Sequence, residues 1–199
     1  MRYVALKTDI IDPDMYSPEW EKAEEGFVDI ECWGGYSPIP KTSFKMLSGP
    51  EGISVLMHTN ETNLRSEVEK ENGPICTDSC MEFFFKPDCH DLNYLNFEFN
   101  PKGVLHLGIG AGRHGRTHLE EDRHIFSIES SAKDGDWTLK FYIPYSFLRV
   151  YFKKVSPVCK GNFYKCGDDT GHEHYGVWSR VEHSVPDYHV PDFFGFIEL

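Results

Sequence analysis

The chain has 199 residues, enough to bury one hydrophobic core, and we predict a single domain over residues 1–199. Its 20 basic and 32 acidic residues give a net charge of −12, the wrong sign for attracting a phosphate backbone, so no nucleic acid partner is expected. No apolar run approaches the roughly 20 residues of a membrane-spanning helix, so no membrane partner is expected either.

Met1 to Ile10 lacks the charged and then apolar pattern of a signal peptide. As given, the chain is expected to be cytoplasmic, and it would be secreted if a leader had been removed.

Segments rich in aromatic and β-branched residues alternate with clusters of Gly, Pro, Asn and Asp, and no helical apolar period persists. The pattern predicts an all-β fold, an antiparallel two-sheet β-sandwich of jelly-roll-like form with long loops. One helical turn is expected at Tyr145 to Leu148. The predicted strands are Gly52 to Thr59, Ser79 to Lys86, Tyr94 to Asn100, Val104 to Ile109, His124 to Ser130, Trp137 to Pro144, Asn162 to Cys166 and Phe193 to Leu199.

The run Asn100-Pro101-Lys102-Gly103 predicts a hairpin turn, because Pro suits the second position of a turn and Gly its end. Residues 61–73 are charged and residues 110–122 are rich in Gly, Arg, His and Glu, so both are expected to be exposed loops.

Alternation along three predicted strands, Ser79 to Lys86, Tyr94 to Asn100 and Trp137 to Pro144, assigns their side chains to faces. One face carries Leu, Phe, Met and Trp and is expected to be core. The other is expected to face outward as a sheet of carboxylate, amide and aromatic groups, among them Tyr94, Asn96, Glu98 and Glu82. Such a surface suits a sugar, which offers hydroxyls to acids and amides and a C–H face to rings. On this feature alone, a solvated polar face without any ligand is the more common case, because most antiparallel sheets have one.

The six cysteines are expected to be free thiols, because a chain of this length needs no disulfides. The spacings Cys76 to Cys80 and Cys159 to Cys166 leave a zinc site open, although a buried small side chain is the commoner role of cysteine. His172 and His174 would share one face of an extended segment, but no third metal ligand is evident. Asp168 and Asp169 offer oxygen ligands of the kind that calcium prefers.

Four sequence blocks, taken in order, resemble the carbohydrate-binding family 9-like proteins, and the likeness spans most of the chain. The blocks are Asp78 to Phe84, Asn96 to Asn100, Asn162 to Asp168 and Pro186 to Gly195. The resemblance implies a β-sandwich without hydrolytic activity that holds sugar ends between aromatic rings and binds structural calcium. A mono- or oligosaccharide is therefore the expected partner, and Asp168 and Asp169 are the expected calcium ligands.

Carried onto matching positions, the resemblance implies that Trp178 stacks on a sugar ring. Glu82, Asn96, Glu98 and Asn162 are the expected hydrogen-bonding residues, and His189 in the last block is a further expected ligand-binding residue. Where such proteins often carry a Trp before the Asp-Ser-Cys block, this chain has Gly73 to Thr77, without an aromatic residue.

Two other functions remain open from the sequence. Glu82 and Glu98 could form the carboxylate pair of an enzyme acting on glycosides, and the sandwich could be a protein-interaction domain. Noncatalytic carbohydrate binding is the function that the residues and the resemblance favour together.

Overall fold

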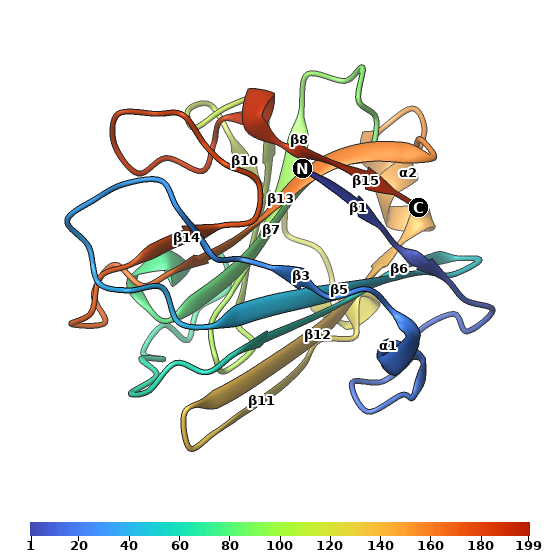
Figure 1. Cartoon of the computed structure of the whole chain (residues 1–199). Coiled ribbons are helices and arrows are strands. Elements are labelled where there is room, and N and C mark those ends of the chain that lie inside the picture. The colour runs from blue at the N-terminus through green and yellow to red at the C-terminus, as the bar shows by residue number, and fades with distance from the viewer.

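The computed structural model describes all of residues 1–199 as two β-sheets packed face to face (Figure 1). One sheet has nine strands and is called sheet A; the other has six and is called sheet B. Two pairs of strands, β1 with β15 and β2 with β5, are parallel, and the other pairs are antiparallel. The prediction of an all-β, two-sheet sandwich is confirmed.

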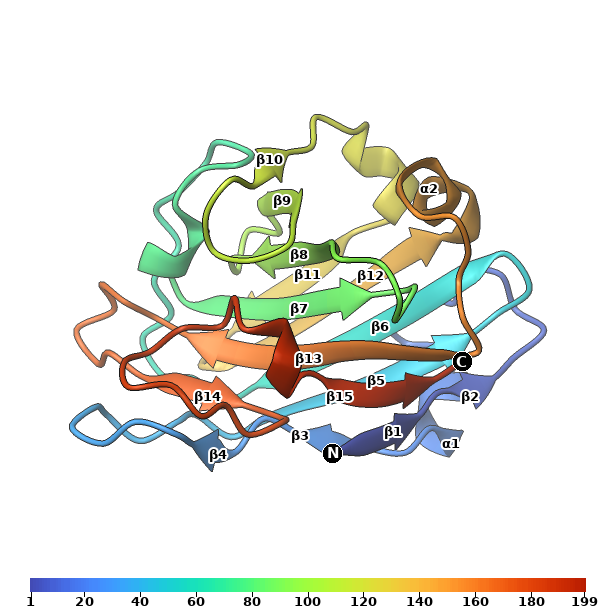
Figure 2. The same cartoon turned by 90° about the horizontal axis from the view of Figure 1, so that it is seen from above.

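Sheet A has the order β1, β15, β13, β7, β8, β9, β10, with β14 pairing with β13 and β4 at one side. Figure 2 looks onto its outer side. Its strands are β1 (Arg2–Val4), β4 (Ile30–Glu31), β7 (Cys80–Lys86), β8 (Tyr94–Phe99), β9 (Leu105–Gly110), β10 (Thr117–His118), β13 (Val158–Cys166), β14 (Tyr175–Val177) and β15 (Gly195–Glu198).

Sheet B has the order β11, β12, β6, β5, β2, with β3 pairing with β5. Its strands are β2 (Leu6–Lys7), β3 (Gly26–Phe27), β5 (Thr42–Ser48), β6 (Gly52–Thr59), β11 (Glu129–Lys133) and β12 (Asp136–Pro144). Short helices connect the strands: α1 (Glu19–Lys22), η1 (Ile75–Thr77), η2 (Arg123–Phe126), α2 (Tyr145–Tyr151) and η3 (Pro191–Phe193).

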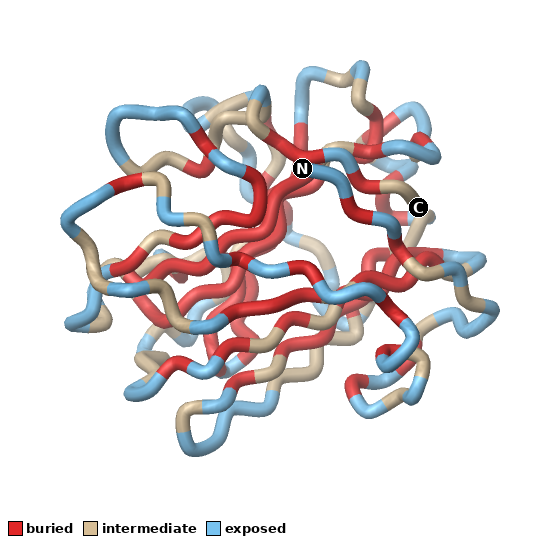
Figure 3. Tube along the Cα trace, in the orientation of Figure 1, coloured by how far each residue is buried: buried red, intermediate tan, exposed pale blue.

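Aromatic rings fill the space between the sheets. The Phe44 ring of β5 stacks on the Phe163 ring of β13 with centroids 3.7 Å apart, and Phe163 stacks in turn on Phe83 of β7 at 4.3 Å. These contacts join the two sheets through the centre of a 29-residue core cluster. Figure 3 shows the same distribution, with buried residues along the strands and exposed ones in the loops.

Most predicted strands are confirmed within about two residues at each end. β6 has the predicted bounds, and the strand predicted from Asn162 is the second half of the longer β13. The Asn100 turn is also present, since Gly103 N donates to Asn100 O at 2.8 Å. The predicted helical turn extends to Tyr151.

The strand predicted for His124 to Ser130 is wrong at its start. Asp122 caps a short helical segment there by accepting a hydrogen bond from His124 N, and Ser127 ends it in the left-handed region with φ 43°. The strand β11 begins only at Glu129. The predicted last strand likewise begins as helix η3 and becomes β15 at Gly195. None of the helices has the length and apolar character that a membrane crossing requires.

Candidate functional site

A cavity of about 570 Å³ lies on the outer face of sheet A. Its floor comes from β7, β8 and β13, and its walls come from three segments far apart in the sequence. The wall segments are Gly73–Cys76, Arg113–Arg116 and Pro186–His189. The site is therefore assembled from most of the length of the chain.

Glu82, Asn96 and Glu98 lie on the floor of the cavity. Glu82 of β7 and Glu98 of β8 are directly opposite each other in the strand register, so their side chains leave the sheet side by side. Asn96 Nδ2 donates to Glu98 Oε1 at 2.7 Å. Three of the predicted ligand-binding residues are thus brought together, and they form one hydrogen-bonding surface.

The polar face is not the exposed surface that alternation predicts. Glu82 is 3% exposed, Glu98 8% and Asn96 1%, because the wall segments cover them. Burial, and next the neighbouring Glu98 charge, raise the pKa of Glu82 well above its ordinary value. A carboxyl group that keeps its proton can donate a hydrogen bond as well as accept one.

Arg116 fastens one wall to the floor. Its guanidinium lies over the Tyr94 ring at 4.4 Å, and its Nε donates to Asn96 Oδ1 at 3.1 Å. Further N–H groups donate to the backbone carbonyls of Gly112, Tyr94 and Gly108. These donors are occupied within the protein, so Arg116 positions Asn96.

His189 and His106 hold the other two wall segments, Pro186–His189 and Gly73–Cys76, and an ion pair joins two of the walls. The Tyr94 hydroxyl and His189 Nδ1 are 2.8 Å apart, and burial lowers the pKa of His189 to about 3, so its ring is neutral at ordinary pH. His106 Nδ1 contacts the Gly73 carbonyl at 3.0 Å. Arg113 Nη2 and Asp187 Oδ1 are 2.9 Å apart and join two wall segments.

The prediction that Trp178 stacks on a sugar is wrong. Trp178 is 3% exposed and lies between the sheets, where it makes edge contacts with Phe44 and Phe163. The backbone of Gly195 packs against it, since a Cβ there would lie 2.6 Å from the ring. The indole is therefore part of the core.

Asn162 does not line the cavity either. Its side chain is fully buried, with Nδ2 donating to Ser179 O and Oδ1 accepting from Ser179 N, both at 2.8 Å. Both polar atoms are used to hold the backbone after Trp178, so Asn162 has a structural role.

Sequence alternation also grouped Trp137 to Pro144 with the two strands of the floor. This segment is β12 and belongs to sheet B, so its outward side chains lie on the opposite side of the sandwich. One of them, Lys140, is buried and paired with Asp12 at 2.5 Å and Glu129 at 3.2 Å. The alternation of side chains within one strand cannot show which sheet the strand joins.

Three aromatic rings line the cavity, namely Phe84, which alternation along its strand places on this face, and Tyr175 and Tyr188, which were not among the predicted site residues. Tyr188 stacks on Tyr164 at 4.0 Å and is buried, whereas Tyr175 is half-buried. Tyr175 lies on β14, directly opposite Cys166 of the neighbouring strand β13. The period-two pattern of β14 is too short to have indicated this position.

The two predicted calcium ligands lie in different surroundings. Asp168 lines the cavity, with Oδ1 buried and without a hydrogen-bond partner, whereas Asp169 is exposed and does not line it. Calcium requires six to eight oxygen ligands, and the groups that act on Asp168 include the carboxylates of Glu173 and Asp169 as well as the Cys76 thiol. Calcium binding by this pair stays a prediction.

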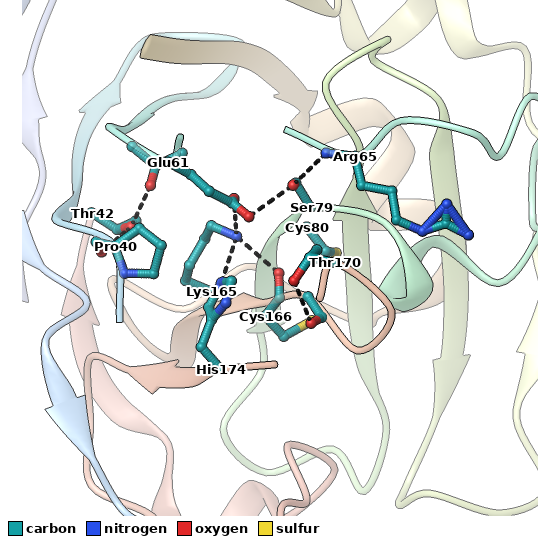
Figure 4. Close-up of polar contacts among 12 residues, drawn as sticks. Pro40, Thr42, Glu61, Arg65, Ser79, Cys80, Lys165, Cys166, Thr170 and His174 are labelled. Atoms are coloured by element: carbon teal, nitrogen blue, oxygen red, sulfur yellow. Dashed lines mark hydrogen bonds and ion pairs between the residues drawn. The ribbon is translucent and has the colours of Figure 1, made fainter. Parts of the chain in front are cut away.

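His172 and His174 do not form a metal pair. His174 is buried in a polar network shown in Figure 4, where Lys165 Nζ lies 3.0 Å from His174 Nε2 and 2.7 Å from Glu61 Oε2. His174 Nδ1 contacts the His172 carbonyl at 2.6 Å. Burial, and next the Lys165 charge, lower the pKa of His174 to about 4.

Comparisons with known proteins agree with this architecture. A candidate carbohydrate-binding protein from Bacteroides uniformis has 27% sequence identity and a TM-score of 0.85, over 99% of this chain and 98% of that one. Carbohydrate-binding modules of family 9 from Caldicellulosiruptor kristjanssonii, in complex with glucose and with cellotriose, each have 12% identity and a TM-score of 0.70. They cover 100% of this chain and 95% and 93% of theirs. At 12% identity, the TM-score of 0.70 shows a shared fold.

None of the curated proteins matches the chain. The sequence profile of carbohydrate-binding family 9, however, matches residues 16–199, which include every strand except β1 and β2 and every wall of the cavity. The chain belongs to carbohydrate-binding family 9.

Proposed function

We propose that the cavity on the outer face of sheet A is a noncatalytic binding site for a mono- or oligosaccharide. The observation that carries the proposal is the row of Glu82, Asn96 and Glu98 at the bottom of a walled cavity. A row of carboxyl and amide groups can accept from and donate to neighbouring sugar hydroxyls. Membership of family 9 and the glucose and cellotriose complexes of two structural relatives support the same ligand class.

The cavity provides an apolar contact as well. Tyr175 is the half-buried aromatic residue of its lining, and the half-buried His189 ring belongs to the wall segment Pro186–His189. Either ring could contact the C–H face of a pyranose, in place of the Trp178 indole that lies in the core. The volume of about 570 Å³ is typical of small-molecule sites.

The arrangement of the two glutamates favours binding over hydrolysis. Glycosidases place two carboxyl groups on either side of the scissile bond. Here Glu82 and Glu98 leave adjacent strands in direct register and lie side by side on the floor. The interpretation as a protein-interaction domain predicts a broad apolar surface, whereas the rim of the cavity carries Arg113, His114 and Asp187.

A glycan array followed by calorimetry tests the proposal, with glucose and cello-oligosaccharides included and with chelator present throughout. Wild-type protein is expected to bind a defined sugar. Glu98→Ala is expected to weaken that binding by about tenfold to a hundredfold, because a charged hydrogen bond contributes about 1.5–3 kcal/mol. The matched control is Glu21→Ala. Glu21 is exposed and lies on α1, which packs against sheet B.

Two results would contradict the proposal. Folded wild-type protein that binds no glycan would show that the family fold is present without its ligand. A bound glycan whose affinity is the same for Glu98→Ala as for wild type would move the site away from this cavity.

A further inference from the structure

Two thiols stand beside Glu82 at the floor of the cavity. Cys80 of β7 and Cys166 of β13 are directly opposite each other in register. Cys80 and Glu82 are two residues apart on one strand, so all three side chains leave the same face of sheet A. The two Sγ atoms and one Glu82 carboxylate oxygen lie within 4.8 Å of one another, and all three residues are buried.

The contacts within this group converge on one oxygen. The Cys166 thiol donates to Glu82 Oε1 at 3.0 Å, and the Cys80 thiol donates to the same atom at 3.5 Å. In a tetrahedral zinc site, bond lengths of about 2.0–2.3 Å place neighbouring ligand atoms about 3.3–3.8 Å apart. The two sulfur-to-oxygen distances are therefore close to those that one zinc ion would require, and the two Sγ atoms lie within 4.8 Å of each other.

The surroundings of the group are acidic. Cys76 and Asp168 line the cavity next to Cys166, and burial raises the pKa of both. The nearby Lys165 does not serve as a counter-ion here. It is opposite Met81 of the core in register, and its ammonium pairs with Glu61 on that other side of the sheet (Figure 4).

We propose that Cys80, Cys166 and Glu82 bind a thiophilic divalent cation, Zn²⁺, with the fourth coordination position facing the cavity, where Cys76 lies. Binding replaces the two thiol protons and the proton that burial keeps on Glu82, and all three are released to solvent. Thiolate ligands favour zinc over the oxygen-preferring calcium and magnesium. The proposal does not depend on sugar binding, although the two sites share Glu82.

Cys159 shows what a buried thiol without this role looks like. It is fully buried on β13 like Cys166, but its Sγ donates to the backbone carbonyls of Ser156 at 3.0 Å and Pro87 at 3.3 Å. The Cys159 thiol contacts no carboxylate in these hydrogen bonds. Cys159→Ser is therefore the matched control for Cys166→Ser.

The experiment is a Co²⁺ titration of chelator-stripped, fully reduced protein, with Zn²⁺ added afterwards. Wild type and Cys159→Ser are expected to take up one Co²⁺ per chain with thiolate-to-cobalt charge-transfer absorption and tetrahedral d–d bands, which Zn²⁺ abolishes by displacement. Cys80→Ser and Cys166→Ser each keep one of the two thiolates, so each is expected to lose about half of the charge-transfer intensity. Each is also expected to lose at least about 100-fold in zinc affinity, which is more than a change beyond the ligands costs. Cys76→Ser is expected to weaken binding less.

Wild-type spectra without charge-transfer absorption would overturn the proposal, and so would full affinity in folded Cys166→Ser. The wild-type titration decides the question even if a variant does not fold. Sugar calorimetry in chelator decides the proposed function separately.

Discussion

At the scale of single residues, Trp178 is part of the core that joins the two sheets. Its indole contacts rings of both sheets, Phe44 of β5 and Phe163 of β13. Truncation to Ala would leave a cavity that the surrounding strands cannot close. We expect Trp178→Ala to lower the free energy of unfolding by about 3–5 kcal/mol in urea denaturation.

Trp178→Phe is the control for this prediction, because it retains an aromatic ring and should cost less than the Ala variant. Sugar binding by the residual folded fraction of Trp178→Ala is expected to be retained, since Trp178 does not line the cavity. A variant that is as stable as wild type but cannot bind sugar would instead assign Trp178 to the binding surface.

His174 predicts a pH dependence of stability. Its pKa is lowered from 6.5 to about 4, by burial and then by Lys165, so between these pH values the unfolded chain binds a proton that the folded chain does not. Stability from this residue is present above pH 6.5 and is lost as the pH falls towards about 4. The limiting slope is about 1.4 kcal/mol per pH unit.

The measurement is urea denaturation of wild type and His174→Gln at a series of pH values. The Gln side chain can still accept from Lys165 and donate to the His172 carbonyl, but it does not titrate. The stability of wild type relative to His174→Gln should therefore fall as the pH is lowered through this range. His114→Gln, at an exposed position, should follow wild type; parallel curves for all three proteins would contradict the prediction.

At the scale of elements, Arg116 links the wall segment before β10 to β8 and β9. Arg116→Lys keeps the charge but cannot reach the same set of acceptors with a single ammonium group. We expect faster hydrogen exchange in residues 110–118 and about a tenfold loss of sugar affinity, because Asn96 loses its partner. Global stability should change little.

The control is Arg180→Lys, an exposed position outside the cavity lining, for which exchange and affinity are expected to remain those of wild type. Unchanged exchange in residues 110–118 of Arg116→Lys would show that the wall is held by other contacts.

The strands show what the sequence predicts and where the prediction fails. Alternation along β7 and β8 correctly separates core residues such as Phe83 and Phe97 from Glu82 and Glu98. The central strand β5 was not predicted, although Thr42, Phe44 and Met46 alternate with Ser43 and Lys45. The alternating pattern was present, but it breaks at Leu47, which is buried directly after the core residue Met46.

The walls of the site could not be predicted from local pattern. Arg113 and Asp187 are 74 residues apart in the chain and meet in an ion pair. Such a contact depends on how loops fold over a sheet, which strand periodicity does not contain. For the same reason the sequence indicated the floor of the cavity but not its burial, and it placed Trp178 on the wrong side of sheet A.

At the scale of the whole molecule, the N-terminal segment ties the two sheets together. β1 pairs with β15 of sheet A and, after Ala5, β2 pairs with β5 of sheet B. The Tyr3 hydroxyl donates to Glu24 O at 2.6 Å and accepts from Met46 N at 3.0 Å. One hydroxyl thus satisfies two backbone groups across the sandwich.

Tyr3→Phe removes that hydroxyl while keeping the ring against Phe44 at the core. The buried Met46 N–H then lacks its partner, and an unsatisfied buried group costs about 1–3 kcal/mol. We expect the free energy of unfolding to fall by that amount in urea, still in a single transition, because both sheets share one core. Loss of signal from one sheet before the other would show instead that the segment is what couples them, and unchanged stability would show that water replaces the hydroxyl at Met46.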